Sequence, residues 1–188
     1  MTDIPEYYDN LIQLHGASHK ALDASSQESL DIRYRILSEV CDMNGKRVLE
    51  VGCNFGALGK YLTEKYPTID YVGIDISEQA IELGHKENPD LDLRRCSLEN
   101  HIGKYDVVVA QGIFYKLTDP QDMLTMIEQM RDLSTEAVAF SAIDVFGGQG
   151  DEMRINPAVL AQYFADVPFS LRHDYHPSDS TFYLYRGK

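Results

Sequence analysis

The sequence "RVLEVGCNFGALGKYL", residues 47–62, decides the fold of this chain. It begins with an apolar run at 47–51, continues through a turn that contains Gly52 and Gly56, and ends in helix-forming residues from Ala57 onward. A strand, a glycine turn and a helix in this order are typical of α/β proteins that bind nucleotides. The stretch therefore predicts a nucleotide site at the end of a strand.

The glycine pattern restricts which nucleotide can bind. A dinucleotide fingerprint reads Gly-x-Gly-x-x-Gly, but here Asn54 stands in place of the second glycine. A phosphate-binding loop would end in Gly-Lys-Ser or Gly-Lys-Thr, and this turn does not. The turn allows the backbone to approach a ligand closely, but it matches a diphosphate poorly. We therefore expect a nucleoside with little or no phosphate.

The segment "YVGIDIS", residues 71–77, supplies the second part of the predicted site. Asp75 follows Gly52 by 23 positions and comes at the end of the next predicted strand. An acidic residue about 20 positions after such a turn accepts hydrogen bonds from ribose hydroxyls. Ligands of open α/β sheets bind beyond the carboxyl ends of the strands. We therefore expect Asp75 and the glycine turn to face one crevice.

Strand-like and helix-like segments alternate along the middle of the chain. We predict strands at 47–51, 70–74, 91–95, 105–110 and 136–142. Helices are predicted at 57–66, 78–87, 120–133 and 157–165. Asp119-Pro120 and Asn156-Pro157 start the last two helices, because each pairs a capping side chain with proline at the first helical position. This alternation predicts a parallel α/β sheet.

The end of the chain has a different pattern. "FSLRHDY" (169–175) and "TFYLYRG" (181–187) are strand-like and are joined by only five residues. That connection is too short for a helical crossover, so the two strands must pair antiparallel. We expect one open sheet, mostly parallel, with an antiparallel hairpin at its edge.

The first 42 residues are helical in pattern. Ser26 is a candidate N-cap, and Leu30, Tyr34 and Leu37 recur on one helical face. A lone helix of this length is marginal in water, so this face must pack on the sheet. We divide the chain into a helical lid, residues 1–42, and a nucleotide-binding domain, residues 43–188.

Three segments together resemble a known family. "VLEVGCNFG", "YVGIDIS" and "YDVVVAQGIF" are similar to motifs I, II and IV of the class I S-adenosylmethionine-dependent methyltransferases, of a small bacterial type. The similarity covers roughly residues 45–142, and the terminal hairpin fits the family's antiparallel seventh strand. The resemblance implies a Rossmann-like sheet of seven strands in the order 3-2-1-4-5-7-6 with helices on both faces. It implies S-adenosylmethionine as the cofactor and S-adenosylhomocysteine as its product.

The resemblance also assigns cofactor contacts. The methionine and ribose part would meet the glycine turn, Asp75 would hold the ribose hydroxyls and Ile76 would pack on the adenine. Ser97 and Leu98 fall where the adenine edge is read, although many members have an acidic residue in place of Ser97. The implied cofactor set is Glu50, Gly52, Cys53, Asn54, Gly56, Asp75, Ile76, Ser97, Leu98, Gln111 and Gly112.

Arg33 is a further cofactor candidate. In related enzymes an arginine at about this place before the first motif binds the cofactor carboxylate, and a forked guanidinium suits a carboxylate. The alternative is a solvated helix arginine such as Arg35. Because Leu30, Tyr34 and Leu37 place Arg33 beside the buried face, we assign it to the cofactor.

Methyl transfer from a sulfonium is a one-step displacement, so alignment and exclusion of water carry much of the rate and no catalytic residue is obligatory. Where the nucleophile is protonated, a base is needed. Tyr7, Tyr8 and Tyr115 are candidates for shaping a substrate pocket. The candidate bases are His15, His19, Asp144, His173 and His176.

Composition narrows the class of partner. The chain has 30 Asp and Glu against 17 Lys and Arg, a formal net charge of −13. Scattered basic residues on an acidic surface argue against nucleic acid. No apolar run reaches the length of a membrane helix, and neither the three cysteines nor the six histidines have metal-ligand spacing. We expect a cytoplasmic monomer or homodimer that has no signal peptide, binds no metal and does not enter a membrane.

These observations favour a small-molecule substrate that is methylated on oxygen or nitrogen. The segment after the fourth predicted strand, 110–113, lacks the Asp/Asn-Pro-Pro-Tyr pattern of enzymes that methylate nucleic-acid bases. Gly147, Gly148 and Gly150 suggest a loop that closes over substrate, or a plain surface loop. Two alternatives remain: a cofactor-binding partner subunit without chemistry of its own, and a methyltransferase for protein or peptide side chains.

Overall fold

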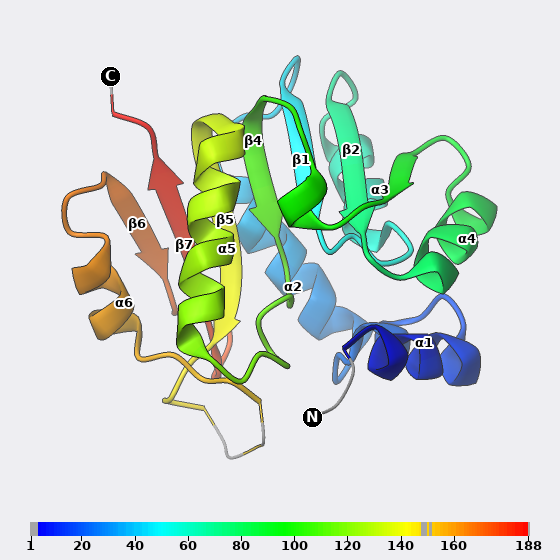
Figure 1. Cartoon of the computed structure of the whole chain (residues 1–188), viewed down its shortest axis with the longest axis horizontal. Helices are drawn as coiled ribbons and strands as arrows, with labels where there is room; N and C mark the ends of the chain where they lie inside the picture. Colours follow the sequence, from blue (N-terminus) through cyan, green and yellow to red (C-terminus); the bar gives the residue numbers. More distant parts are fainter. Residues whose placement is uncertain (1–3, 148–149, 151, 188) are drawn as a thin grey trace.

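A seven-stranded sheet forms the centre of the molecule, which is described here from a computed structural model covering residues 4–147, 150 and 152–187 (Figure 1). The strand order is β3-β2-β1-β4-β5-β7-β6, as expected. The first five strands run parallel, and β7 pairs antiparallel with both β5 and β6. The strands are β1 (Arg47–Val51), β2 (Asp70–Asp75), β3 (Asp92–Arg95), β4 (Tyr105–Ala110), β5 (Ser134–Ile143), β6 (Phe169–Arg172) and β7 (Asp179–Tyr185).

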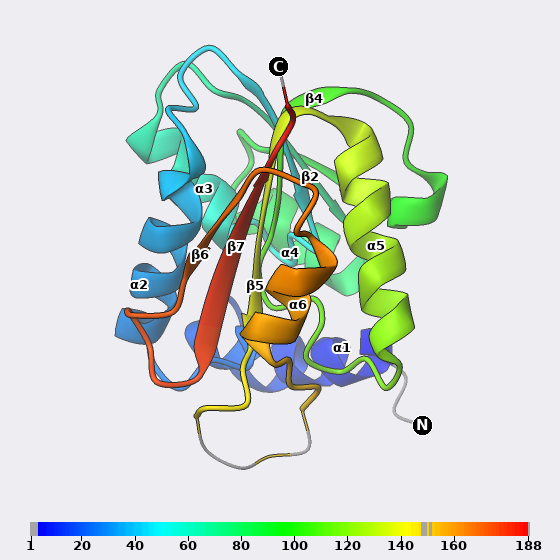
Figure 2. The same ribbon diagram turned by 90° about the vertical axis from the view of Figure 1, so that its left-hand side faces the viewer.

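Helices cover both faces of the sheet, as Figure 2 shows with the sheet seen nearly edge-on. α2 (Gln27–Leu37), α3 (Ala57–Lys65) and α4 (Glu78–Glu87) pack on one face. α5 (Pro120–Leu133) and α6 (Pro157–Tyr163) pack on the other. Three short 3-10 helices, η1 (His19–Leu22), η2 (Ser38–Val40) and η3 (Leu98–Asn100), lie in the connections.

The predicted helix starts are confirmed. The Asp119 side chain accepts a hydrogen bond from the Gln121 backbone at 2.8 Å, and the Asn156 side chain accepts one from Ala158 at 3.0 Å. Ser26 caps α2 in the same way through the Ser29 amide. Each cap satisfies a backbone donor that the first helical turn leaves free.

The core consists of two apolar layers, one on each face of the sheet. Leu49, Val108 and Phe140 belong to the layer under α5 and α6. Val48, Val107 and Val109 belong to the layer under α2 and α3. Neighbouring residues of β1 and β4 thus alternate between the two layers, because successive side chains of a strand point to opposite faces. Both faces are apolar, as expected for a sheet covered on both sides.

Two strands are longer than the sequence indicated. β5 begins at Ser134 and ends at Ile143, and β7 begins at Asp179, which the sequence pattern had left in the hairpin connection. The antiparallel ladder pairs Ile143 with Asp179 and Ala137 with Tyr185. Asp179 can join the strand because side chains from α2 and from the hairpin turn hold its carboxylate.

The helix α1 (Ile4–His15) lies across the carboxyl ends of the parallel strands, at the lower edge of the molecule in Figures 1 and 2. A small apolar cluster of Ile12, Ala21, Phe55 and Ala80 holds it against the start of α4 and the glycine turn. This packing brings the N-terminal segment to the edge of the sheet where α/β proteins bind ligands. Within the described residues, no helix is both long and apolar enough to cross a membrane.

Candidate active site

The glycine turn between β1 and α3 has three residues with a positive φ. Gly52, Asn54 and Gly56 have φ angles of 72°, 48° and 84°. Glycine, and to a lesser degree asparagine, adopts this region readily, which explains the choice of residues. A Cβ added at Gly52 would lie 2.3 Å from Cγ2 of Ile113 across the turn, so this position has no room for a side chain.

Asp75 joins the glycine turn to the end of β2. Its Oδ2 accepts a hydrogen bond from the Asn54 amide at 2.8 Å, and its Oδ1 accepts one from the Ser77 amide at 2.9 Å. Burial raises the pKa of Asp75, and the hydrogen bonds from backbone amides oppose this shift. Each carboxylate oxygen keeps a second lone pair, so Asp75 can still accept hydrogen bonds from a ligand.

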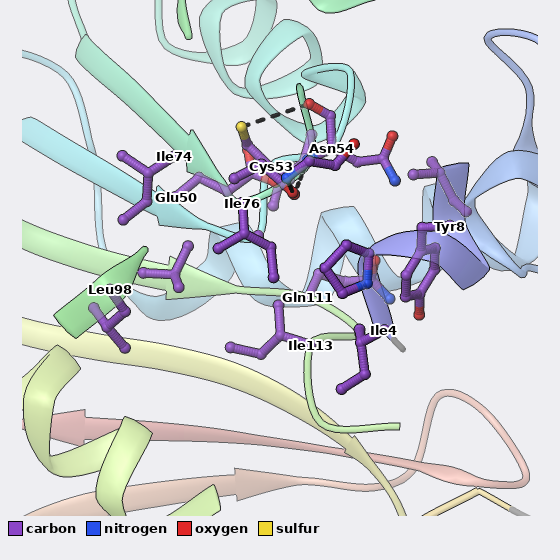
Figure 3. A pocket seen from close by; sticks show the side chains of 18 of the residues that line it. Ile4, Tyr8, Glu50, Cys53, Asn54, Ile74, Ile76, Leu98, Gln111 and Ile113 are labelled. Atoms are coloured by element: carbon purple, nitrogen blue, oxygen red, sulfur yellow. Dashed lines mark hydrogen bonds between the residues drawn. The ribbon is translucent and has the colours of Figure 1, made fainter. Parts of the chain in front are cut away.

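A cavity of about 270 Å³ opens at this edge of the sheet (Figure 3). The carboxyl ends of β1, β2 and β4 contribute to it, and α1 covers it. Of the residues that the sequence assigned to the cofactor, the cavity is lined by Glu50, Gly52, Cys53, Asn54, Asp75, Ile76, Leu98, Gln111 and Gly112.

Glu50 is the most buried charged group in the cavity wall. It is 3% exposed, and its Oε2 accepts a hydrogen bond of 2.5 Å from the Tyr71 hydroxyl. Burial raises the pKa of Glu50 to about 8; the bond from Tyr71 lowers it and the neighbouring Asp75 raises it. The cavity thus contains two carboxyl groups, which suit the hydroxyl and ammonium groups of a ligand.

The N-terminal segment forms one wall of the cavity. Ile4, Pro5 and Tyr8 line it from α1, and Figure 3 shows Ile4 and Tyr8 facing it from the side opposite the glycine turn. Asp9 accepts a hydrogen bond of 2.5 Å from the Ser77 hydroxyl, which joins α1 to the start of α4. Tyr8, a candidate for shaping a substrate pocket, lines this cavity.

Tyr7 lies beside the cavity and not in its wall. Its hydroxyl donates to Asp23 at 2.8 Å, and the Lys116 ammonium lies 4.5 Å from the centre of its ring. Lys116 also pairs with Asp23 at 3.3 Å. The three residues connect α1, the residue after η1 and the connection before α5, so Tyr7 holds the wall together.

Arg33, expected to bind the cofactor carboxylate, does not line the cavity. Its Nε donates to Oδ2 of Asp179, and its Nη1 donates to the Ser29 hydroxyl at 2.7 Å. Arg35, by contrast, is exposed and pairs with Glu39. Arg33 is therefore the buried arginine of α2, but in this structure its partner is a carboxylate of β7.

Gly56 and Ser97 also lie outside the cavity wall. Gly56 is the N-cap of α3, where an added Cβ would lie 3.0 Å from the Leu91 side chain and 3.1 Å from that of Leu93. The Ser97 hydroxyl accepts a hydrogen bond from the Asn100 side chain at 2.9 Å. Both residues shape the elements around the cavity, while Cys96 and Leu98, on either side of Ser97, line it.

The candidate bases differ in burial. His15 and His173 are exposed, and His19 is half-buried in η1. Asp144 is 2% exposed, and its two oxygens accept hydrogen bonds of 2.9 Å from the Ser180 hydroxyl and the Phe146 amide. Gly147 and Gly150 of the predicted closing loop are described by the structure, whereas Gly148 lies outside the described residues.

A polar cluster formed by Arg33, Tyr115, His176 and Asp179 lies at the same edge of the sheet. Asp179 is fully buried; its Oδ2 lies 3.1 Å from Nδ1 of His176, and its Oδ1 has no hydrogen-bond partner among the described residues. Tyr115 is buried, and the Gln111 side chain contacts its hydroxyl at 3.5 Å. Because Gln111 lines the cavity, the polar cluster connects with the cavity wall.

Several cavity residues were not found from the sequence. Some of them lie inside the motif segments and the others in segments whose patterns indicate only core packing, and a sequence pattern does not show that they share one cavity. These residues are Ile4, Pro5, Leu22, Tyr34, Val51, Ala57, Leu58, Ile74, Ser77, Cys96, Ile113, Leu117 and Met126.

The sheet order and the antiparallel terminal hairpin define a Rossmann-like fold of the methyltransferase type. Residues 49–135 match the family model described as a methyltransferase domain. The match begins in β1 and ends in β5, so it contains the glycine turn and Asp75. Residues 49–135 are therefore a methyltransferase domain, and the fold of the chain is that of S-adenosylmethionine-dependent methyltransferases of known structure.

Relatives of known name are similar over part of the chain. The phthiotriol/phenolphthiotriol dimycocerosates methyltransferase of Mycobacterium tuberculosis is 34% identical over 83 residues, which are 43% of this chain. The match spans only 30% of that relative's length.

Solved structures show the same fold at low sequence identity. The N-methyltransferase NodS of Bradyrhizobium japonicum, in complex with S-adenosylhomocysteine, has a TM-score of 0.69 at 15% identity, with 96% of this chain and 98% of that one covered. Magnesium protoporphyrin IX methyltransferase of Synechocystis, with bound cofactor, has a TM-score of 0.67 at 17% identity, with 86% and 79% covered.

Proposed function

We propose that this chain transfers a methyl group from S-adenosylmethionine to a small-molecule acceptor, on oxygen or nitrogen. The observation that carries this proposal is the cavity itself. The glycine turn, two carboxyl groups and an apolar wall meet in it at the carboxyl ends of β1, β2 and β4. A nucleoside with a charged amino-acid tail requires this combination.

The residues of the cavity fit most parts of the cofactor. Asp75 has the lone pairs for two ribose hydroxyls, and Ile76, which is 47% exposed in this structure, offers an apolar surface for adenine. Glu50 suits the ammonium group. No arginine or lysine lines the cavity within the described chain. For Arg33 to reach the cofactor carboxylate, its guanidinium would have to leave Asp179.

The protein's own part in the reaction is alignment and exclusion of water. The cofactor supplies a methyl group on a positively charged sulfur, which makes the methyl carbon electrophilic. Gln111 and Gly112, just after β4, border the place where an acceptor would meet that carbon. Ile4, Pro5 and Tyr8 cover the cavity, and exclusion of water strengthens the electrostatic interactions inside it.

The polar cluster supports a role in handling the acceptor's proton. Burial lowers the pKa of His176, and Asp179, whose Oδ2 lies 3.1 Å from Nδ1 of His176, opposes the shift. The orphan Oδ1 of Asp179 can accept a hydrogen bond from an O–H or N–H group. In this proposal His176 would take the acceptor's proton, while the acceptor's oxygen or nitrogen would take the methyl group and S-adenosylhomocysteine would leave. His15 and His173, which are exposed, do not have this environment.

A small molecule is favoured over a macromolecule as the acceptor. The net charge of −13 opposes binding of nucleic acid. Two of the similar proteins above are named as methyltransferases of phthiotriol/phenolphthiotriol dimycocerosates and of magnesium protoporphyrin IX, and neither name refers to a macromolecule, which supports a small-molecule acceptor for this chain. Few residues lie outside the sheet, its helices and the segment that covers the cavity, which leaves little chain for a separate domain that would recognise a macromolecule.

A thermal-shift comparison of four ligands tests the cofactor assignment. S-adenosylmethionine and S-adenosylhomocysteine should raise the melting temperature, since a ligand at about 100 times its Kd stabilises the folded state by about 2.7 kcal/mol. NAD and ATP should have no comparable effect, because the turn matches a diphosphate poorly. Stabilisation by NAD alone would overturn the assignment.

Transfer of a labelled methyl group tests the activity. We would incubate the protein with methyl-labelled S-adenosylmethionine and mixtures of phenols, amines and carboxylic acids, and follow label in the organic extract. Label in a small-molecule product supports the proposal. Label recovered only in added protein or peptide would support the alternative of side-chain methylation. Cofactor binding without transfer to any acceptor would favour a partner subunit.

A further inference from the structure

Tyr71 is a buried tyrosine whose hydroxyl donates a hydrogen bond to a residue of the cavity wall. It lies on β2 and is 6% exposed. In the parallel pair of β1 and β2, Val48 is opposite Tyr71 and Glu50 is opposite Gly73. Paired residues of adjacent strands point to the same face, so Tyr71 and Glu50 share a face and are diagonal neighbours. The Tyr71 side chain extends across Gly73, and its hydroxyl donates to Glu50 at 2.5 Å.

Two glycines make the space for this phenol. A Cβ at Gly73 would lie 2.7 Å from the Tyr71 hydroxyl, and a Cβ at Gly59 would lie 2.4 Å from its ring. Gly59 is inside α3, where glycine destabilises a helix by about 1 kcal/mol relative to alanine. Neither glycine has a positive φ, so the need for space and not backbone conformation explains both. The two glycines thus leave the space in which the Tyr71 ring lies and its hydroxyl contacts the Glu50 carboxylate.

The groups that face Glu50 are mostly acidic or neutral. Asp75 comes from β2, Cys53 from the glycine turn and Tyr34 from α2. Burial and Asp75 raise the pKa of Glu50, and among the side chains that act on it the Tyr71 hydroxyl favours the ionised form. Tyr71 therefore performs two tasks: it fixes one carboxylate oxygen, and it stabilises the negative charge.

We propose that Tyr71 is a positioning residue for the cofactor, which orients Glu50 so that its second oxygen receives the cofactor's α-ammonium group. This inference rests on the proposed function, because it assumes that the cavity takes S-adenosylmethionine. Tyr71 does not touch the cofactor and acts through Glu50. Its removal should change recognition of the amino-acid part of the ligand and leave recognition of the nucleoside part unchanged.

Two ligands separate these parts. S-adenosylhomocysteine carries the amino acid, whereas 5′-methylthioadenosine has the same nucleoside and thioether without it. Calorimetry at pH 7 should show that Tyr71→Phe weakens S-adenosylhomocysteine binding about tenfold, since a hydrogen bond to a charged group contributes roughly 1.5 kcal/mol. Binding of 5′-methylthioadenosine should change less than twofold. Tyr183→Phe is the matched control, because Tyr183 is also buried and donates its hydroxyl only to the Ile36 carbonyl.

The titration of Glu50 gives a readout without any ligand. With selective ¹³C labelling of glutamate, the Glu50 carboxyl resonance, assigned through Glu50→Gln, should titrate at higher pH in Tyr71→Phe than in the unmodified chain. The pH midpoint of S-adenosylhomocysteine affinity should move upward by the same amount. An unmoved titration, or an equal loss for both ligands, would overturn the proposal and reduce Tyr71 to a packing residue.

The proposed function fails in a different way. If the unmodified chain binds neither ligand, the cofactor assignment is wrong, and this inference falls with it. If the unmodified chain binds both ligands and Tyr71→Phe behaves like Tyr183→Phe, the cofactor assignment stands and only the role of Tyr71 is refuted.

Discussion

Asp75 holds the glycine turn in place and faces the ligand cavity with the same carboxylate. Its two oxygens take the Asn54 and Ser77 amides, so the turn, the end of β2 and the start of α4 meet at one side chain. A residue with both tasks requires a test that separates folding from binding.

The first prediction concerns the ribose contact of Asp75. We expect Asp75→Ala to weaken S-adenosylhomocysteine binding by about one to two orders of magnitude, because two ribose hydroxyls lose a charged acceptor worth roughly 1.5–3 kcal/mol. Calorimetry measures the affinity and circular dichroism checks the fold. Asp70→Ala, at the exposed start of the same strand, is the control and should bind normally. Unchanged affinity in a folded Asp75→Ala would place Asp75 outside the cofactor site.

Arg33 and Asp179 form a pair in which each residue makes the burial of the other tolerable. The side chains are 10% and 0% exposed. Removing one partner of a buried ion pair leaves an uncompensated charge and costs about 3–5 kcal/mol.

The second prediction follows from this pair. Arg33→Met should lower the free energy of unfolding by about 3–5 kcal/mol in urea titrations. Arg35→Met removes only an exposed pair with Glu39 and should cost about 0.3–0.5 kcal/mol. If the two variants are similarly stable and Arg33→Met loses cofactor affinity, Arg33 binds the cofactor and its pair with Asp179 contributes little to stability.

At the scale of elements, α1 behaves as a cover attached at a few polar points. Ser77 with Asp9 and Gln79 with Gln13 join it to α4, and Tyr7 joins it to Asp23. Its apolar contribution to the core is small, since Ile12 is its one buried residue among those described. An element with few buried apolar contacts opens at low free-energy cost.

The third prediction is that α1 opens less often when the cofactor is bound. Hydrogen exchange of residues 7–15 should slow when S-adenosylhomocysteine is added, because Ile4, Pro5 and Tyr8 line the same cavity. Asp9→Ala should speed exchange in the absence of ligand, since it removes the bond to Ser77. Asn10→Ala, at an exposed position of the same helix, serves as the control. If the exchange rates in α1 are the same with and without S-adenosylhomocysteine, the helix is a fixed part of the fold.

For the whole molecule, the buried Glu50 couples stability to pH. Its folded pKa of about 8 lies above the value of about 4.3 for a free glutamate. A raised pKa means that the folded state holds the proton more tightly than the unfolded state. The stability from Glu50 is therefore fully present below about pH 4.3 and is lost as the pH rises through about 8.

The fourth prediction compares Glu50→Gln with the unmodified chain. Without ligand, the variant should gain relative stability steadily from about pH 5 to pH 8, because it lacks the group whose ionisation opposes folding. Urea unfolding at pH 5, 6, 7 and 8 measures the difference, and the other titrating groups cancel in it. A difference that does not vary with pH would show that Glu50 titrates normally.

Local sequence patterns determined the order of elements and most of the cofactor cavity. The glycine turn, the end of β2 at Asp75 and the two helices that begin with proline each depend on residues within a few positions of one another. The sequence pattern therefore predicted all of them. Nine of the twelve residues assigned to the cofactor line the cavity, because each lies at or just after the carboxyl end of a strand that the sequence pattern indicated. The ends of parallel strands meet at one edge of a sheet, so knowing the strands placed these residues together.

Only the tertiary structure decided which side chains those elements bring into contact. Asp179 is 146 positions from Arg33 and bonds to it because α2 packs beside β7. Tyr71 reaches Glu50 because two glycines, one in β2 and one in α3, leave room for its ring. Ile4 and Tyr8 complete the cavity because α1 folds back over the edge of the sheet. Such contacts depend on the register and packing of distant elements, and no local spacing of residues encodes them.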